Sequence, residues 1–138
     1  MPVNASIRHV FQFRLDLSSG VPVYRQIIDQ VLGGIATGKL RGGDQLPTVR
    51  QLAVDLSINP NTVVRAYREL EIREILSTQQ GTGTFITDKE VPKPAEAERQ
   101  RRAAHLAREF LARAGAEGIT LEELLHQLTE LKNEQRRP

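Results

Sequence analysis

The sequence predicts a mainly α-helical chain that carries one small β-hairpin. Apolar residues recur at helical spacing in five segments of the 138-residue chain. Two short runs, 75–78 and 84–87, flank a glycine-containing turn at 80–83, which is typical of a hairpin. The predicted order along the chain is three helices, the hairpin and two further helices.

Residues 1–20 are expected to form an N-terminal arm. Apolar and polar side chains alternate over residues 11–15, which predicts a short strand, and Ser18-Ser19-Gly20 breaks it. Pro22 suits the first turn of a helix because its missing N–H is not needed there. Apolar residues then follow at helical spacing as far as Gly38, a residue that commonly ends a helix.

Two shorter helices follow a turn-rich segment at 41–44. Thr48 is expected to cap the first of them. After a break at 57–59, a second helix is predicted over residues 60–73. Their expected buried faces comprise Val49, Leu52, Ala53 and Leu56 in the first, and Val63, Ala66, Tyr67 and Leu70 in the second.

The segment from residue 88 begins with a proline-containing linker, 88–95. A long helix is predicted over residues 95–114, and Thr120 with Glu123 forms a capping box that starts a last helix. Both helices have apolar faces, which include Leu106, Phe110, Leu121, Leu124, Leu125 and Leu128. We therefore expect three parts: an arm, 1–20; a main domain, 21–87; and a helical tail, 88–138.

Composition and charge exclude several classes of protein. The chain has no cysteine and three scattered histidines, so we expect no metal site and no cofactor. No phosphate-binding glycine loop or nucleophile motif is visible, so an enzyme is not expected. The sequence shows no membrane-spanning segment or secretory signal, which favours a cytoplasmic location. The formal net charge is +2, but residues 39–68 hold five basic and two acidic side chains. The positive excess therefore lies in the middle of the chain, where nucleic acid could bind.

Three helices followed by a hairpin are the order of a winged helix-turn-helix domain. In such domains one helix enters the major groove of DNA and the preceding helix braces it. The exposed face of the helix at 60–73 offers amides, a hydroxyl and guanidinium groups. Amides can read adenine and arginine can read guanine, so this face is suited to reading base sequence.

Three ordered motifs resemble those of GntR-family transcription regulators. Residues 46–53 (LPTVRQLA) are similar to the family's "LPSxRxLA" motif, 59–71 to its recognition helix, and 81–86 (GTGTFI) to its "GxGTFV" wing. The resemblance covers about residues 11–87. The opening segment and a remainder of only about fifty residues, which form two helices, resemble the YtrA subfamily, whose short tail serves dimerisation.

The resemblance implies a set of DNA-contacting positions. Many family members carry arginine where this chain has Pro60 and Val64, so their base preferences do not transfer directly. Asn59 could instead serve as a helix cap, and Arg68 could instead pair with Glu69 or Glu71. The expected DNA-binding residues are Thr48, Arg50, Asn59, Asn61, Thr62, Arg65, Arg68, Gly81 and Thr82.

The expected function is that of a sequence-specific transcription regulator, acting as a repressor on a palindromic operator in double-stranded DNA. A two-helix tail has too little core to stand alone, so a homodimer through the tail is expected. A small-molecule effector could bind at the dimer interface, or between the tail and the DNA-binding domain, and change the spacing of the two recognition helices. The alternatives are a winged-helix module that binds other proteins and an architectural DNA binder without sequence preference.

Overall fold

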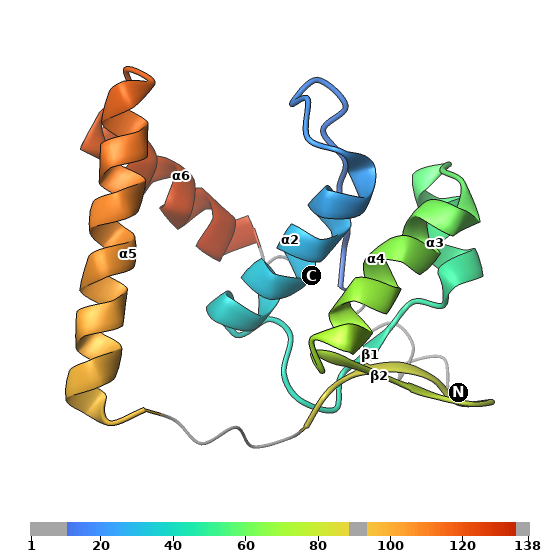
Figure 1. Cartoon of the computed structure of the whole chain (residues 1–138). Helices are drawn as coiled ribbons and strands as arrows, with labels where there is room; N and C mark the ends of the chain where they lie inside the picture. Colours follow the sequence, from blue (N-terminus) through green and yellow to red (C-terminus); the bar gives the residue numbers. More distant parts are fainter. Residues whose placement is uncertain (1–10, 89–93, 135–138) are drawn as a thin grey trace. The chain divides into compact units, whose positions relative to one another are not determined.

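Three helices and a small antiparallel sheet make up the first part of the protein. The computed structural model describes residues 11–88 and 94–134, and it divides into two compact units, Met1–Lys89 and Glu90–Pro138. The first unit contains α2 (Val23–Thr37), α3 (Val49–Leu56) and α4 (Pro60–Ile72). Helix α4 contacts α2, α3 and the sheet, so it lies at the centre of this unit (Figure 1).

The predicted helices of the first unit are confirmed, and the predicted inner face is fully buried in α4 but only partly in α3, where Val49 and Leu56 are half-buried. All four residues expected on the inner face of α4 are buried, and Val63, Ala66 and Leu70 have no measurable exposure. They pack with Ile27, Ile28 and Val31 of α2 and with Leu52 and Ala53 of α3 in one hydrophobic cluster. Burial of these apolar faces is the main stabilising contribution to the unit.

The sheet has one strand more than the sequence pattern predicts. Strands β2 (Leu76–Gln79) and β3 (Gly83–Ile86) form the predicted hairpin. A third strand, β1 (Gln45–Leu46), pairs antiparallel with β3, which gives the order β1-β3-β2. A two-residue strand is too short to show any alternation, which is why the sequence pattern does not reveal it.

The strand predicted at 11–15 is wrong. This segment runs along α2 without pairing to another strand, and glutamine side chains satisfy its backbone. Gln30 accepts from the Arg14 N–H at 2.8 Å and donates to the Arg14 carbonyl at 2.6 Å. Gln26 makes the same pair of bonds with Asp16, at 2.8 and 2.9 Å. Two side chains thus replace the neighbouring strand, while Phe13 is buried in the core.

Gly34 allows this arm to approach α2 closely. A Cβ at residue 34 would lie 2.8 Å from the Phe11 ring and 2.9 Å from Leu40. We expect Gly34→Ala to lower the free energy of unfolding by about 1–3 kcal/mol, because the added methyl overfills a packed site. Gly33→Ala on the same helix is the matched control, since nothing lies within 4 Å of its Cβ position.

Urea denaturation of the two variants tests this assignment. Gly33→Ala is expected to raise the free energy of unfolding by roughly 0.5–1 kcal/mol, because alanine favours a helix more than glycine does. If both substitutions shifted the urea midpoint equally and in the same direction, the close packing at Gly34 would make no contribution to stability.

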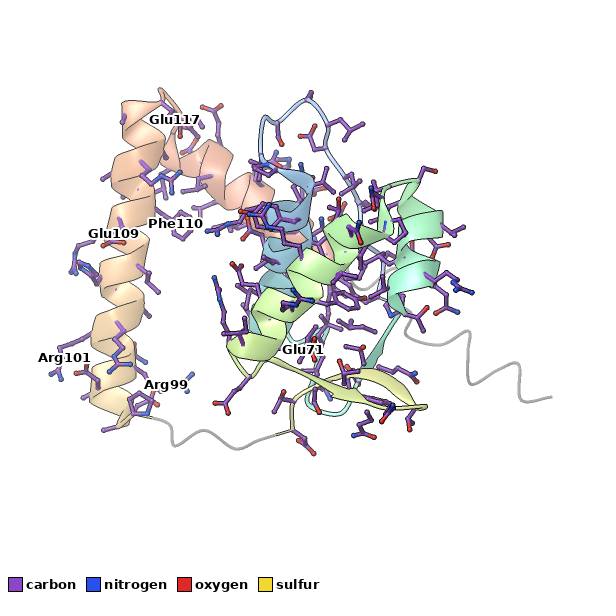
Figure 2. All side chains as sticks on the ribbon, turned by 45° about the vertical axis from the view of Figure 1, so that its right-hand side comes forward. Glu71, Arg99, Arg101, Glu109, Phe110 and Glu117 are labelled. Carbon is purple, nitrogen blue, oxygen red and sulfur yellow. The ribbon has the colours of Figure 1, made fainter. Side chains whose placement is uncertain are left out.

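The second unit is a pair of helices with little buried surface. It contains α5 (Glu96–Ala116) and α6 (Leu121–Glu134), as the sequence predicts, and the Thr120–Glu123 capping box is present. Among the described residues of both helices only Ala114 is buried. Phe110 is 59% exposed and Leu125 is 51% exposed. Figure 2 shows Phe110 and Arg101 on opposite sides of α5, so the helix has an apolar and a charged face.

No helix in the described ranges is long and apolar enough to cross a membrane. Those ranges also contain no group of three or more histidine, aspartate or glutamate side chains placed to hold a metal ion. His105 lies 2.8 Å from Glu109, one turn along α5.

Candidate DNA-binding surface

A tight turn fixes helices α3 and α4 relative to each other. The Thr48 side chain accepts from the Gln51 N–H, and the Gln51 side chain accepts from the Thr48 N–H, so a full capping box starts α3. Helix α3 ends at Ser57, whose left-handed backbone conformation, with a φ of 55°, turns the chain out of the helix. Only residues 57–59 separate the two helices, which is the geometry of a helix-turn-helix.

The buried side chain of Tyr67 links α4 to the start of α3. Its side chain is buried, and its hydroxyl donates to the Pro47 carbonyl at 2.7 Å, directly before the cap of α3. Burial raises the pKa of the Tyr67 hydroxyl above its ordinary value of 10.0, because the phenolate would lose its hydration. This bond therefore holds the start of α3 against the middle of α4 while the hydroxyl stays neutral.

We expect this hydroxyl to make stability depend on pH in the alkaline range. With a pKa raised in the folded state, its contribution is complete below pH 10.0 and falls as pH rises further. Tyr67→Phe is expected to lose about 0.5–1.5 kcal/mol at neutral pH through the missing hydrogen bond. It should also flatten the fall in stability between about pH 9 and pH 11. Urea midpoints of the wild type and Tyr67→Phe at about pH 9 and pH 11 test this. An equal fall in the midpoints of the two proteins between these pH values would contradict it.

The outer face of α4 presents polar and basic side chains to solvent. Asn61, Arg65 and Arg68 are exposed and lie at successive turns of the helix. The pairing of Arg68 with glutamate is not observed: Glu69 lies 3.5 Å from Arg73, and Glu71 accepts from Thr78 at 2.8 Å. A shallow depression on this face is lined by Asn61, Val64, Arg65, Arg68, Glu69 and Ile72.

The Arg65 guanidinium group lies over an aromatic ring from another helix. Its guanidinium carbon lies 3.7 Å from the ring centroid of Tyr24, the second residue of α2. This distance is within the range of a cation–π interaction. Sequence spacing places Tyr24 in the apolar stripe of α2, and no local pattern could reveal a contact between residues 41 positions apart.

The remaining predicted residues of the two helices lie at the N-terminal ends of α3 and α4. Thr48 and Arg50 are exposed at the start of α3. Asn59 caps α4, because its side chain accepts from the Asn61 N–H at 2.8 Å, so the capping interpretation holds for it. Thr62 is half-buried beside it. Pro60 occupies the first position of α4, where its missing N–H is harmless.

A side chain from strand β1 supports the tip of the hairpin between β2 and β3. Gly81 and Gly83 have φ values of 81° and 132°, a backbone region that favours glycine. The Gln45 side chain donates to the Thr82 carbonyl at 3.1 Å, and a Cβ on Gly83 would lie 2.5 Å from the same Gln45 nitrogen. Gln45 of β1 therefore supports the tip that carries Gly81 and Thr82, a role that its position directly after the turn-rich segment at 41–44 does not indicate.

Comparison with known proteins is consistent with this geometry. Residues 23–86 match the profile of the bacterial regulatory proteins of the gntR family. The HTH-type transcriptional regulator Rv1152 of Mycobacterium tuberculosis is 38% identical over 121 residues, which are 88% of this chain and 94% of that protein. The chain belongs to the GntR family. It is therefore a winged helix-turn-helix DNA-binding transcription regulator and not an enzyme.

Two further proteins to which the chain is similar carry the name YtrA. The HTH-type transcriptional repressor YtrA of Bacillus subtilis is 44% identical over 75 residues, which are 54% of this chain and 58% of that protein. The solved structure of YtrA from Sulfolobus acidocaldarius, a GntR-family transcription factor, superposes with a TM-score of 0.52 at 33% identity. It covers 75% of this chain and 97% of that one, so the likeness includes part of the helical tail.

Proposed function

We propose that this GntR-family regulator binds a palindromic operator as a homodimer and represses the promoter that it covers. The observation that carries the proposal is the outer face of α4. Asn61, Arg65 and Arg68 project from it at successive turns, directly after a rigid helix-turn-helix turn. Amide and guanidinium groups at this place in the fold suit bidentate recognition of bases in a major groove.

Other exposed groups of the same unit suit contact with the DNA backbone. Arg50 lies in the first turn of α3, next to the exposed Thr48. The hairpin tip offers Gly81 and Thr82, and the Gln45 side chain donates to the Thr82 carbonyl. In the proposed complex, α4 reads bases, Arg50 and the start of α3 bind phosphates, and the tip contacts the flanking minor groove. Binding is then expected to weaken as salt concentration rises.

The tail supports the homodimer. Its apolar residues are exposed on both helices, and the pair has almost no core of its own. A second copy of the tail is the simplest partner, since closed two-fold dimers are the commonest oligomers. The interface we propose includes Leu106, Phe110, Leu121, Leu124, Leu125 and Leu128.

Repression is the regulatory outcome we favour, and the relative whose name is HTH-type transcriptional repressor YtrA supports it. A protein that occupies a promoter excludes polymerase without any further activity. We also propose that any effector acts at the dimer interface by changing the distance between the two α4 helices, because half-site spacing is a geometric requirement. Because the target is chromosomal DNA, the proposed place of action is the cytoplasm.

In-vitro selection from a random DNA pool at near-physiological salt tests the proposal. We expect the wild-type protein to enrich a palindrome, and a reporter promoter containing that palindrome to be silenced when the protein is present. An architectural DNA binder would retain DNA without enriching a motif. A protein-interaction module would retain no DNA, and either result would overturn the proposed function.

A further inference from the structure

The contact between Arg65 and Tyr24 joins the proposed base-reading face to a helix outside the helix-turn-helix pair. Arg65 sits in the middle of that face, one turn from Asn61 and one turn from Arg68. Tyr24 belongs to the first turn of α2, and it packs partly against the hydrophobic core. The ring is thus fixed by the fold, whereas the arginine side chain is long and exposed.

The distance of 3.7 Å determines what this contact does to the guanidinium group. At this separation the guanidinium carbon is in van der Waals contact with the face of the ring. The N–H donors of arginine lie in the guanidinium plane, so a guanidinium group that packs flat on the ring keeps them free for an acceptor. In the described part of the chain, Arg65 makes no ion pair, so the ring is its observed partner.

We infer that Tyr24 is a positioning residue for DNA recognition, which holds the Arg65 guanidinium ready to donate to a base. This inference rests on the proposed function, in which Arg65 reads the operator. A free arginine side chain loses much rotamer freedom when it binds, and pre-organisation reduces that loss. The ring also restricts the plane of the guanidinium, which sharpens selection for a purine that accepts two parallel hydrogen bonds.

Two substitutions at Tyr24 separate stacking from simple space filling. Tyr24→Phe keeps the ring, and it should bind the selected operator within about twofold of wild type. Tyr24→Leu removes the ring but keeps an apolar side chain of helical preference. It should weaken operator binding roughly tenfold or more, because the symmetric complex of a dimer with its operator would contain two such contacts. Affinity for a scrambled duplex of equal length and composition should change by less than about twofold, since phosphate contacts remain.

A double-mutant cycle shows whether Tyr24 acts through Arg65. We expect Tyr24→Leu to cause no further loss of operator affinity when Arg65→Ala is already present. A purely structural role would lower affinity by the same factor in both backgrounds, and it would also lower binding to the scrambled duplex. Thermal melting of all four proteins checks that each is folded at the temperature of the binding measurement.

The outcomes distinguish failure of this inference from failure of the proposed function. If Arg65→Ala keeps full operator affinity, Arg65 is not a reader, and both the proposed contact and this inference are overturned. If Arg65→Ala loses affinity while Tyr24→Leu binds as tightly as wild type or tighter, only the positioning role is overturned. Loss with Tyr24→Leu, retention with Tyr24→Phe and no additional loss in the Arg65→Ala background would support it.

Discussion

Phe110→Asp and Leu125→Asp are each expected to convert the proposed dimer into a monomer and to weaken operator binding by roughly 100-fold or more. Both side chains are more than half exposed in the single chain, at 59% and 51%. A homodimer would bury two copies of each against apolar partners. An aspartate at such a position is costly, because an unpaired charge must lose its hydration. Sedimentation equilibrium and fluorescence anisotropy measure the two expected effects.

Ala112→Asp provides a matched control for these variants. Residue 112 is exposed and lies about 200° around α5 from Phe110, so the same charge is added on the opposite face. The control should remain dimeric and bind the operator within about twofold of wild type. If Phe110→Asp and Leu125→Asp also remained dimeric, the tail would not form the proposed interface.

Arg65→Ala has the second large expected effect, and this effect is on specificity. Each bidentate contact between arginine and guanine contributes about 1–3 kcal/mol of discrimination, and a dimer would make two. We therefore expect operator affinity to fall by about 30-fold or more, while binding to a scrambled duplex falls far less. Anisotropy titrations with both duplexes at one salt concentration measure the ratio.

Arg73→Ala is the corresponding control on the same element. Arg73 caps the C-terminus of α4 and lies 3.5 Å from Glu69. Its removal deletes the same charge but not the proposed base contact, so operator affinity should fall by less than about threefold. Equal losses for Arg65→Ala and Arg73→Ala would mean that α4 contributes only general positive charge.

Local sequence patterns predict most of this fold. Helical periodicity identifies the buried face of α4 because a central helix must bury one stripe, and all four expected residues are buried. Cap chemistry is equally local, and both Thr48 and Thr120 begin helices as predicted. Gly38 ends α2 as predicted, because its φ of 82° lies in the left-handed region that favours glycine.

Features that depend on distant partners are the ones that local patterns miss. The alternation of residues 11–15 is real, but Gln26 and Gln30 take the place of the strand that it would need. Strand β1 exists only because β3 lies beside it. The supports of the proposed site, Tyr24 under Arg65 and Gln45 beside the hairpin tip, join segments about 40 residues apart. Spacing within one element carries no information on such contacts.

The most direct test of the central claim is the dependence of binding on the spacing of the two operator half-sites. The wild-type protein is titrated against the selected palindrome, a single half-site, and the palindrome with five base pairs inserted at its centre. If a dimer places two α4 helices on one face of the duplex, we expect tight binding to the uninterrupted palindrome alone. The insertion rotates one half-site by about half a turn, so its affinity should fall to that of the single half-site. Equal affinity for the palindrome and the inserted duplex would contradict the claim that two copies of α4 read one operator together.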